Sequence, residues 1–169
     1  MKNYIVIITI ALLTTACSYK DETITSKSGT MSVTQPAFWF EIDSLNDDAD
    51  IRIGNPLLEA YFIIIREPQT DLPEGYTLEE YSQTTREYIK AGSTSYTELL
   101  DNSFTRINKL AAIKYTIDAT VENVDIRYWH VSLKSKKGFY QLIAWSLPTK
   151  FESNQENFTL VIDSFRELK

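Results

Sequence analysis

Ala111-Ala112-Ile113-Lys114-Tyr115-Thr116-Ile117-Asp118-Ala119-Thr120-Val121-Glu122 carries the clearest structural pattern in the chain. Apolar side chains at its odd positions alternate with mostly polar side chains at its even positions, which is the two-residue period of a β-strand. The stretch therefore predicts a long strand, and the segments on either side of it predict the rest of a sheet.

The residues that follow predict two more antiparallel strands. In the first, the two faces are formed by Arg127, Trp129, Val131 and Leu133 and by Ile126, Tyr128, His130 and Ser132. Residues 134–138 predict a hairpin tip, where Gly138 can take a left-handed conformation. Residues 138–147 predict the returning strand, whose two apolar faces indicate a central position in the sheet.

Two helices are predicted from capping residues and apolar stripes. Thr77 and Glu80 predict a capping box at the start of the first helix, which ends at Gly92. Ser153 and Glu156 predict a second capping box near the C-terminus. The apolar stripe of this second helix comprises Phe158, Val161, Ile162, Phe165 and Leu168. We expect it to pack on the sheet, because nothing else can bury these side chains.

Shorter strands are predicted in the first part of the domain. Residues 31–42 predict a strand with Phe38 and Phe40 on one face and a bend at Pro36. Residues 51–53 predict a short strand, and residues 57–66 predict a central one. The whole order predicts an α+β fold, with a mostly antiparallel β-sheet packed with two main helices.

The closing segment carries a recognisable pattern. The strand Gly138–Ala144 is followed by a loop with Phe151 and by the helix Asn157–Arg166, which carries a "Phe…Ile…Ser-Phe" signature. This pattern resembles the closing strand and helix of the PsbP/Mog1-like superfamily. The segment Phe38-Trp39-Phe40 and the helix after residue 76 also fall where that family has them. The resemblance covers residues 31–169 in layout and implies an α/β/α sandwich. Because most members bind or scaffold, it implies no catalytic residue.

The N-terminus predicts that the protein is exported and attached to a membrane. Lys2, the apolar core of residues 4–13 and the small residues Thr14-Thr15-Ala16 have the order of a secretory signal peptide. The only cysteine, Cys17, follows them, so we expect removal of residues 1–16 and acylation of Cys17, as in a bacterial lipoprotein. Residues 17–30 are polar and without period, which predicts a flexible tether on the order of 20 Å long before a single domain over residues 31–169.

The residues after Cys17 and the net charge predict location and partners. Ser18 in place of an aspartate favours the bacterial outer membrane, with the domain facing the periplasm. Lys20-Asp21-Glu22 resembles the signal that sends some lipoproteins to the cell surface, which is the alternative. The charge of −6 falls to −7 when Lys2 is removed with the leader, which argues against nucleic acid as a partner.

No catalytic, metal or cofactor motif is predicted. His130 is the only histidine, and its strand neighbours Tyr128 and Ser132 are not acids, so we expect no catalytic residue, no metal and no cofactor. Asn46-Asp47-Asp48-Ala49-Asp50 lacks the glycine and the distal glutamate of an EF-hand loop and predicts a solvated turn. Three lysines at the hairpin tip, Lys134, Lys136 and Lys137, are also expected to be solvated.

A candidate interaction surface is predicted on the polar face of the sheet. If the strands pair in order, Tyr128, His130 and Tyr140 share this face with Lys114 nearby. We expect a binding or scaffold module for another envelope protein, attached to the membrane through Cys17. The alternative is a carrier with a Tyr/Trp-lined pocket, which needs an enclosed cavity of about 300 Å³ or more. A hydrolase built on His130 is the third hypothesis.

Overall fold

β8, the strand with the period-two pattern, spans Leu110–Val121 and pairs along its whole length with β9 (Val124–Lys134) in the computed structural model. The structure describes residues 20–99 and 103–169; the predicted signal peptide and Cys17 lie outside them. The remaining elements are β1 (Glu22–Thr25), β2 (Met31–Gln35), β3 (Phe40–Glu41), η1 (Asp43–Leu45), β4 (Ile51–Asn55), β5 (Ala60–Pro68), η2 (Gln69–Asp71), α1 (Leu78–Ala91), β6 (Ser95–Glu98), β7 (Ser103–Ile107), β10 (Gly138–Ser146), α2 (Pro148–Asp163) and β11 (Arg166–Glu167).

The main sheet has the strand order β3-β4-β5-β10-β9-β8-β6, and β7 pairs with the first half of β8. All of these pairs are antiparallel. β10 lies between β5 and β9, which confirms its predicted central position. Gly138 opens this strand with a φ of +151°, and a Cβ there would clash with the carbonyl oxygen of Glu67, so the close approach of β5 requires glycine.

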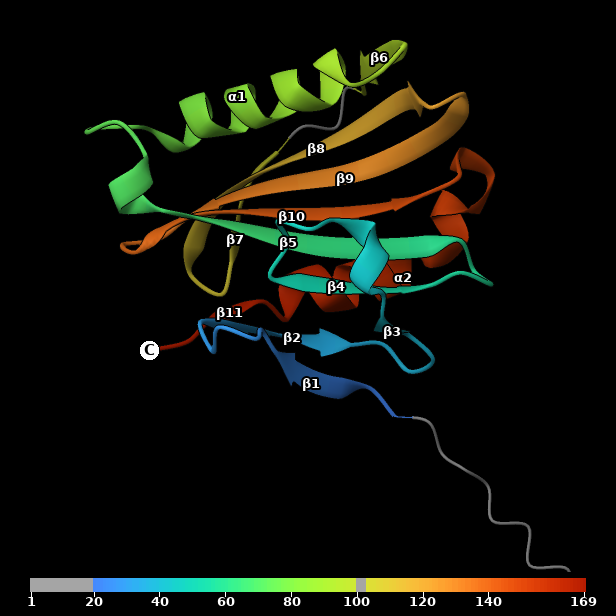
Figure 1. Cartoon of the computed structure of the whole chain (residues 1–169), viewed down its shortest axis with the longest axis horizontal. Coiled ribbons are helices and arrows are strands. Elements are labelled where there is room, and N and C mark those ends of the chain that lie inside the picture. Colours follow the sequence, from blue (N-terminus) through green and yellow to red (C-terminus); the bar gives the residue numbers. More distant parts are fainter. Residues whose placement is uncertain (1–19, 100–102) are drawn as a thin grey trace, which may run out of the picture.

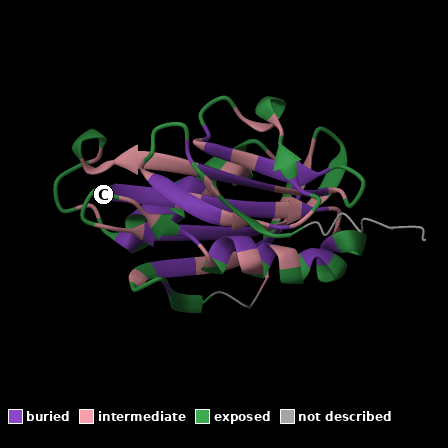
Figure 2. Cartoon of the chain, turned by 90° about the horizontal axis from the view of Figure 1, so that it is seen from below, coloured by how far each residue is buried: buried purple, intermediate pink, exposed green. Residues whose placement is uncertain are grey.

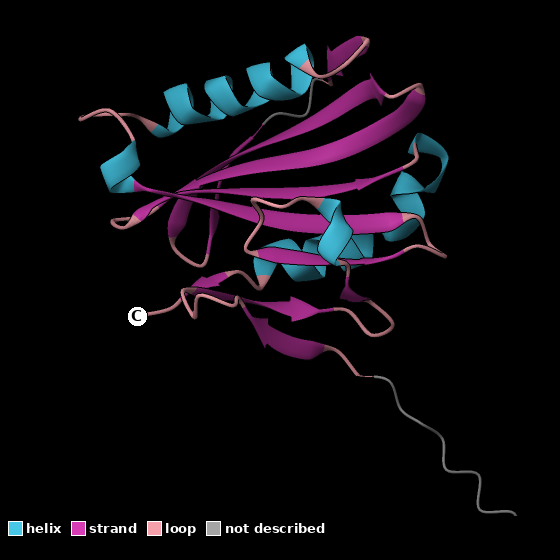
Figure 3. Ribbon diagram, viewed as in Figure 1, coloured by secondary structure: helices cyan, strands magenta, loops and turns pink. Residues whose placement is uncertain are grey.

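The two helices cover opposite faces of the main sheet (Figures 1 and 3). α1 lies over β8, β9 and β10, whereas α2 packs against β10, β5 and β9 and also against β2. A second sheet, with the order β1-β2-β11, lies beside α2. The described architecture is therefore a mostly antiparallel sheet with two main helices, and the predicted fold class is confirmed.

The largest hydrophobic cluster lies between α2 and the sheet. Figure 2 shows that the buried segments are concentrated on the strands and on the inner faces of the helices. Phe151 and Phe158 of α2 each contact the ring of Trp129 on β9, with centroids 5.4 and 6.2 Å apart. Phe165 follows α2 and is fully buried against Tyr140. This packing fixes the C-terminal helix on the sheet, as its apolar stripe predicts.

The prediction of a flexible tether over residues 17–30 is wrong for residues 20–30, which the structure describes. Glu22–Thr25 form β1, which pairs with β2 from Glu22 opposite Gln35 to Thr25 opposite Ser32. The turn that follows is closed by Ser26 Oγ, which accepts hydrogen bonds from the N–H groups of Thr30 and Met31. A short edge strand of polar residues has no apolar period to reveal it. The folded domain therefore includes residues before Met31.

Two other predicted boundaries differ from the structure. α2 begins at Pro148 rather than at Ser153, because proline at the first helical position has a preset φ and needs no N–H partner. Ser153 lies inside the helix, and its hydroxyl donates to the carbonyl of Lys150. The strand predicted over 31–42 is divided at Pro36 into β2 and β3. By contrast, the capping box of Thr77 and Glu80 is confirmed at the start of α1.

Candidate functional site

The predicted interaction surface does not form, because its residues point to opposite faces of the sheet. Tyr140 pairs with Leu133 and Lys114 pairs with Val131, and directly paired residues share a face. Tyr140 and Lys114 therefore lie on the α2 face, whereas Tyr128 and His130 lie on the α1 face. His130 and Tyr140 are also fully buried, because each face carries a helix.

On the α2 face, Tyr140 and Lys114 have structural partners. The hydroxyl of Tyr140 donates to Glu167 Oε1 of β11 at 2.6 Å, and burial together with Glu167 raises the pKa of Tyr140 to about 12. Lys114 Nζ lies 3.4 Å from the centroid of the Trp129 ring, in a cation–π contact. Tyr140 therefore links the central strand to the C-terminal segment.

On the α1 face, fully buried His130 belongs to a chain of polar groups in which Gln141 and Glu67 are half-buried. His130 Nε2 and Gln141 Oε1 are 3.3 Å apart, Gln141 Nε2 donates to Glu67 Oε1, and the Tyr81 hydroxyl of α1 donates to the same carboxylate oxygen at 2.8 Å. Desolvation lowers the pKa of His130 to about 4, and burial raises the pKa of Tyr81. The imidazole is therefore neutral at pH 7 and hydrogen-bonds to an amide instead of a carboxylate, an arrangement that links α1 to three strands.

The predicted acidic turn at residues 46–50 follows η1 and precedes β4. Within it, Asn46 Oδ1 accepts a hydrogen bond from the N–H of Asp48, as in a local Asx turn. Among residues 20–99 and 103–169, no group of three histidine, cysteine or acidic side chains is placed to hold a metal ion.

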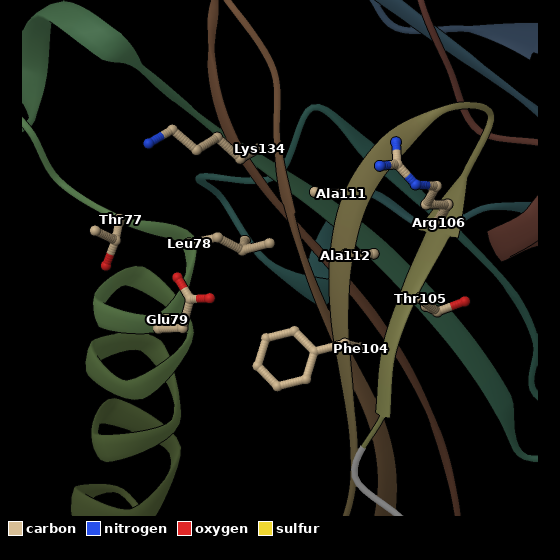
Figure 4. Close-up of a pocket in the computed structure, with 9 residues that line it drawn as sticks. All are labelled: Thr77, Leu78, Glu79, Phe104, Thr105, Arg106, Ala111, Ala112 and Lys134. Carbon is tan, nitrogen blue, oxygen red and sulfur yellow. The ribbon is translucent and has the colours of Figure 1, made fainter.

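An open cleft of about 870 Å³ lies between the start of α1 and the β7–β8 hairpin (Figure 4). We call it cleft A. It is lined by Thr77, Leu78, Glu79, Phe104, Thr105, Arg106, Ala111, Ala112 and Lys134. Arg106 and Lys134 supply positive charge and Glu79 supplies negative charge, and Lys134 Nζ is anchored by a 2.6 Å hydrogen bond to the carbonyl of Tyr76. The cleft therefore combines polar groups with the apolar surface of Phe104.

A smaller cleft of about 210 Å³, cleft B, lies on the other side of β7. It is lined by Ser103, Thr105, Ile107, Lys114, Trp129, Val131, Thr159, Ile162 and Asp163. Thr105 borders both clefts. β7 thus separates two hollows that face opposite sides of the sheet, and neither hollow is lined by a tyrosine.

The outer edge of β7 has no partner strand among the described residues. Asn108 and Lys109 join β7 to β8, and both have positive φ, as a type I′ turn requires. In such a hairpin the residues that flank the turn, Ile107 and Leu110, form a hydrogen-bonded pair, and such pairs alternate along the ladder. Phe104 and Arg106 therefore direct their backbone N–H and C=O groups away from β8.

Sequence reasoning missed this edge. The sequence pattern predicts no strand at residues 103–107, whose side chains are mostly exposed. A usable signal was Asn108, since asparagine tolerates the left-handed conformation of a tight turn before the apolar start of β8.

Comparison with known proteins identifies structures with a similar fold. No family model matches the chain, and no curated protein matches it. The solved structures that resemble it include the cyanobacterial PsbP of Synechocystis (TM-score 0.64, 8% identity, covering 89% of this chain and 94% of that one). LpqN of Mycobacterium tuberculosis, described as involved in cell envelope biogenesis, has a TM-score of 0.63 at 10% identity, with 88% of this chain and 91% of that chain covered.

A third similar structure is PA94 of Pseudomonas aeruginosa, described as a protein of unknown function and putative regulator. Its TM-score is 0.58 at 10% identity, and the match covers 88% of this chain and 98% of that one. All three alignments extend over most of both chains, so the similarity concerns the whole domain. The chain contains a domain with the PsbP/Mog1-like fold, as its closing segment predicts.

Proposed function

We propose that this protein is a lipid-anchored binding module of the bacterial envelope, which takes up an extended segment of another envelope protein as an added strand on β7. The observation that carries the proposal is the outer edge of β7 between clefts A and B, which pairs with no strand in the part of the chain that the structure describes. An added strand satisfies the outward N–H and C=O groups of Phe104 and Arg106. Main-chain hydrogen bonds of this kind supply affinity without requiring a particular sequence.

The two clefts supply the selectivity. Successive side chains of a strand point to opposite faces, so those of an added strand enter cleft A and cleft B in turn. In cleft A they meet the Phe104 ring, which is 74% exposed, and the charges of Arg106 and Lys134. The segment that fits best has an apolar side chain next to Phe104 and a polar or acidic one near the two cations.

The envelope location rests on the leader and on one structural neighbour. Residues 4–17 have the order of a lipoprotein signal that ends in Cys17. LpqN, whose fold is similar, is described as involved in cell envelope biogenesis. Among the described residues, no helix has the length and apolarity needed to span a membrane. We propose attachment to the outer membrane through acylated Cys17, with the domain facing the periplasm; display on the cell surface is the alternative.

Removal of one backbone N–H group from the outer edge of β7 tests strand addition. Arg106→Pro in the full-length protein removes an outward N–H that β8 does not use, and proline is tolerated at such an edge position. Arg106→Ala removes the same side chain but keeps the N–H, which makes it the matched control. The measurement is photocrosslinking from position 104 in intact envelopes, followed by recovery of the crosslinked partner.

We expect crosslinking to one partner with the parent and with Arg106→Ala, and binding weakened about fivefold with Arg106→Pro, since the one lost hydrogen bond costs about 1 kcal/mol. Matching thermal melts show that the fold is intact. Equal crosslinking by both variants would contradict strand addition. The lipid anchor is tested separately with Cys17→Ala. We expect this variant to be released from the membrane fraction, and its retention there would contradict the anchor.

A further inference from the structure

At the other end of the domain, four large apolar side chains are exposed together. They are Phe38 and Phe40, near the β2–β3 connection, and Leu57 and Leu58, in the β4–β5 turn, with exposed fractions of 61%, 51%, 94% and 42%. All four line one open hollow of about 650 Å³, and we call them the apolar patch. Exposed apolar groups gathered in this way mark a contact with another apolar surface.

A buried side chain holds both loops of the apolar patch in place. Asn55 is only 7% exposed; its Nδ2 donates to the carbonyl of Phe38 at 3.0 Å, and its Oδ1 accepts a hydrogen bond from the N–H of Leu57 at 3.0 Å. Phe38 also has a φ of +69°, a left-handed conformation that is uncommon for a bulky residue. Backbone strain of this kind persists where the surrounding structure enforces it, often at functional positions.

The position of the apolar patch identifies its partner. Lys20, the first described residue, lines the same hollow. Only three peptide steps join Lys20 to Cys17, so their Cα atoms lie at most about 11 Å apart. From the lipid anchor of the proposed function, on which this step depends, we infer that the apolar patch inserts into the surface of the bilayer that holds Cys17. The domain then has a second membrane contact beside its lipid.

Apolar burial, rather than charge, supplies this contact. Lys20 and Glu22 both line the hollow and offset each other, and the whole chain carries a net charge of −6. Attraction to anionic headgroups is therefore absent, whereas phenylalanine and leucine side chains partition readily into the region between headgroups and acyl chains. The insertion should be equally deep in neutral and in anionic vesicles.

Two attachment points orient the domain. In Figure 1 the β4–β5 turn lies at one end of the long axis, and the β9–β10 turn beside the start of α1 lies at the other. Cleft A belongs to this second end, because Lys134 and Thr77 line it. With the apolar patch in the bilayer, cleft A and the edge of β7 face away from it, toward other envelope proteins.

The test uses the full-length, processed protein reconstituted into protein-free phosphatidylcholine vesicles, with or without phosphatidylglycerol. Because acylated Cys17 has no free thiol, Leu57→Cys provides a single site for an environment-sensitive fluorophore, and Glu79→Cys provides the matched control in cleft A. We expect the label at position 57 to emit at shorter wavelength, to be quenched by brominated lipid at a depth of about 5–10 Å, and to resist aqueous iodide. The label at position 79 should show the reverse.

Flotation of the same vesicles separates the two claims. If the protein floats with the vesicles but both labels are equally open to iodide, the anchor stands and insertion is overturned. If the label at position 57 is shielded only in native envelopes, the apolar patch binds a protein, which also overturns insertion. If the processed protein does not float at all, the lipid anchor itself fails. Phe40→Ser with Leu58→Ser should reduce the wavelength shift at position 57 without reducing flotation.

Discussion

The two faces of the sheet are built differently. The α2 face is one continuous apolar core from Met31 to Phe165, whereas the apolar residues of the α1 face form two smaller clusters, one around Tyr81 and Phe139 and one around Ile63 and Ile143. His130, Gln141 and Glu67 form a polar chain on the α1 face. The comparison indicates that the α2 face supplies most of the stability, while the α1 face has smaller apolar clusters joined by a chain of polar side chains.

Buried polar atoms without a hydrogen-bond partner among the described residues occur on both faces. They include His130 Nδ1 and Ser132 Oγ on the α1 face, and Trp39 Nε1 and Arg66 Nε on the α2 side. Each such atom costs about 1–3 kcal/mol relative to a satisfied one. Both faces carry this cost, so the difference between them lies in the size of their apolar clusters, and four predictions can test it.

The largest expected effect is the removal of a core aromatic ring from the α2 face. Phe158→Ala should lower the free energy of unfolding by about 3–5 kcal/mol, because Phe158 is fully buried between Trp39, Trp129 and Phe151. Leu78→Ala, at the rim of cleft A on the α1 face, should cost about 2 kcal/mol. Urea denaturation measures both values, and equal losses would remove the distinction between the faces.

The second effect is a pH dependence that arises on the α1 face. The pKa of His130 is about 4 in the folded protein and close to 6.5 in the unfolded chain, so the unfolded state binds the extra proton between these values. Stability should therefore fall by about 3 kcal/mol as the pH decreases from 6.5 to 4, with no further contribution below. The measurement is urea denaturation at several pH values. His130→Gln should flatten this part of the profile, and an unchanged profile would show that His130 is not the group responsible.

The third test uses two tyrosines that each donate to a glutamate, one on each face. Tyr81→Phe and Tyr140→Phe remove hydrogen bonds to Glu67 and Glu167, respectively, and each should cost about 2 kcal/mol. Their local effects should differ. Hydrogen exchange should increase in α1 for Tyr81→Phe and in β11 for Tyr140→Phe, and an increase spread evenly over the domain in both variants would contradict separate roles.

The smallest effect distinguishes the two helix starts. Thr77→Ala removes the confirmed N-cap of α1 and should cost about 1 kcal/mol. Ser153→Ala alters the same sequence motif inside α2 and should change stability by less than about 0.5 kcal/mol. Thermal melts of both variants provide the comparison. A larger loss for Ser153→Ala would indicate that α2 begins at that residue after all.

The sequence predicted the elements whose signals are local. The alternation of residues 111–122, the cap at Thr77 and the apolar stripe around Phe158 each correspond to a physical period or a hydrogen bond between near neighbours. β1 and β7 escaped prediction because they are short edge strands, whose mostly exposed side chains need no apolar period.

The candidate site could be predicted less fully from the sequence, because it depends on the register in which the strands pair. Whether Tyr140 shares a face with His130 depends on its pairing with Leu133, which the β9–β10 turn sets and which composition does not reveal. The exposed edge of β7 likewise arises because β6 and β7 pair with different halves of β8. Such an arrangement has no signal in any single segment.

Strand addition to β7 is tested most directly by residue-resolved amide exchange with and without the partner recovered by crosslinking. We predict that the N–H groups of Phe104 and Arg106 become protected at least about tenfold, because each gains a hydrogen bond. The N–H of Thr105, which is directed toward β8, should change little. Binding of the partner with unchanged exchange at Phe104 and Arg106 would contradict the proposed mode of recognition.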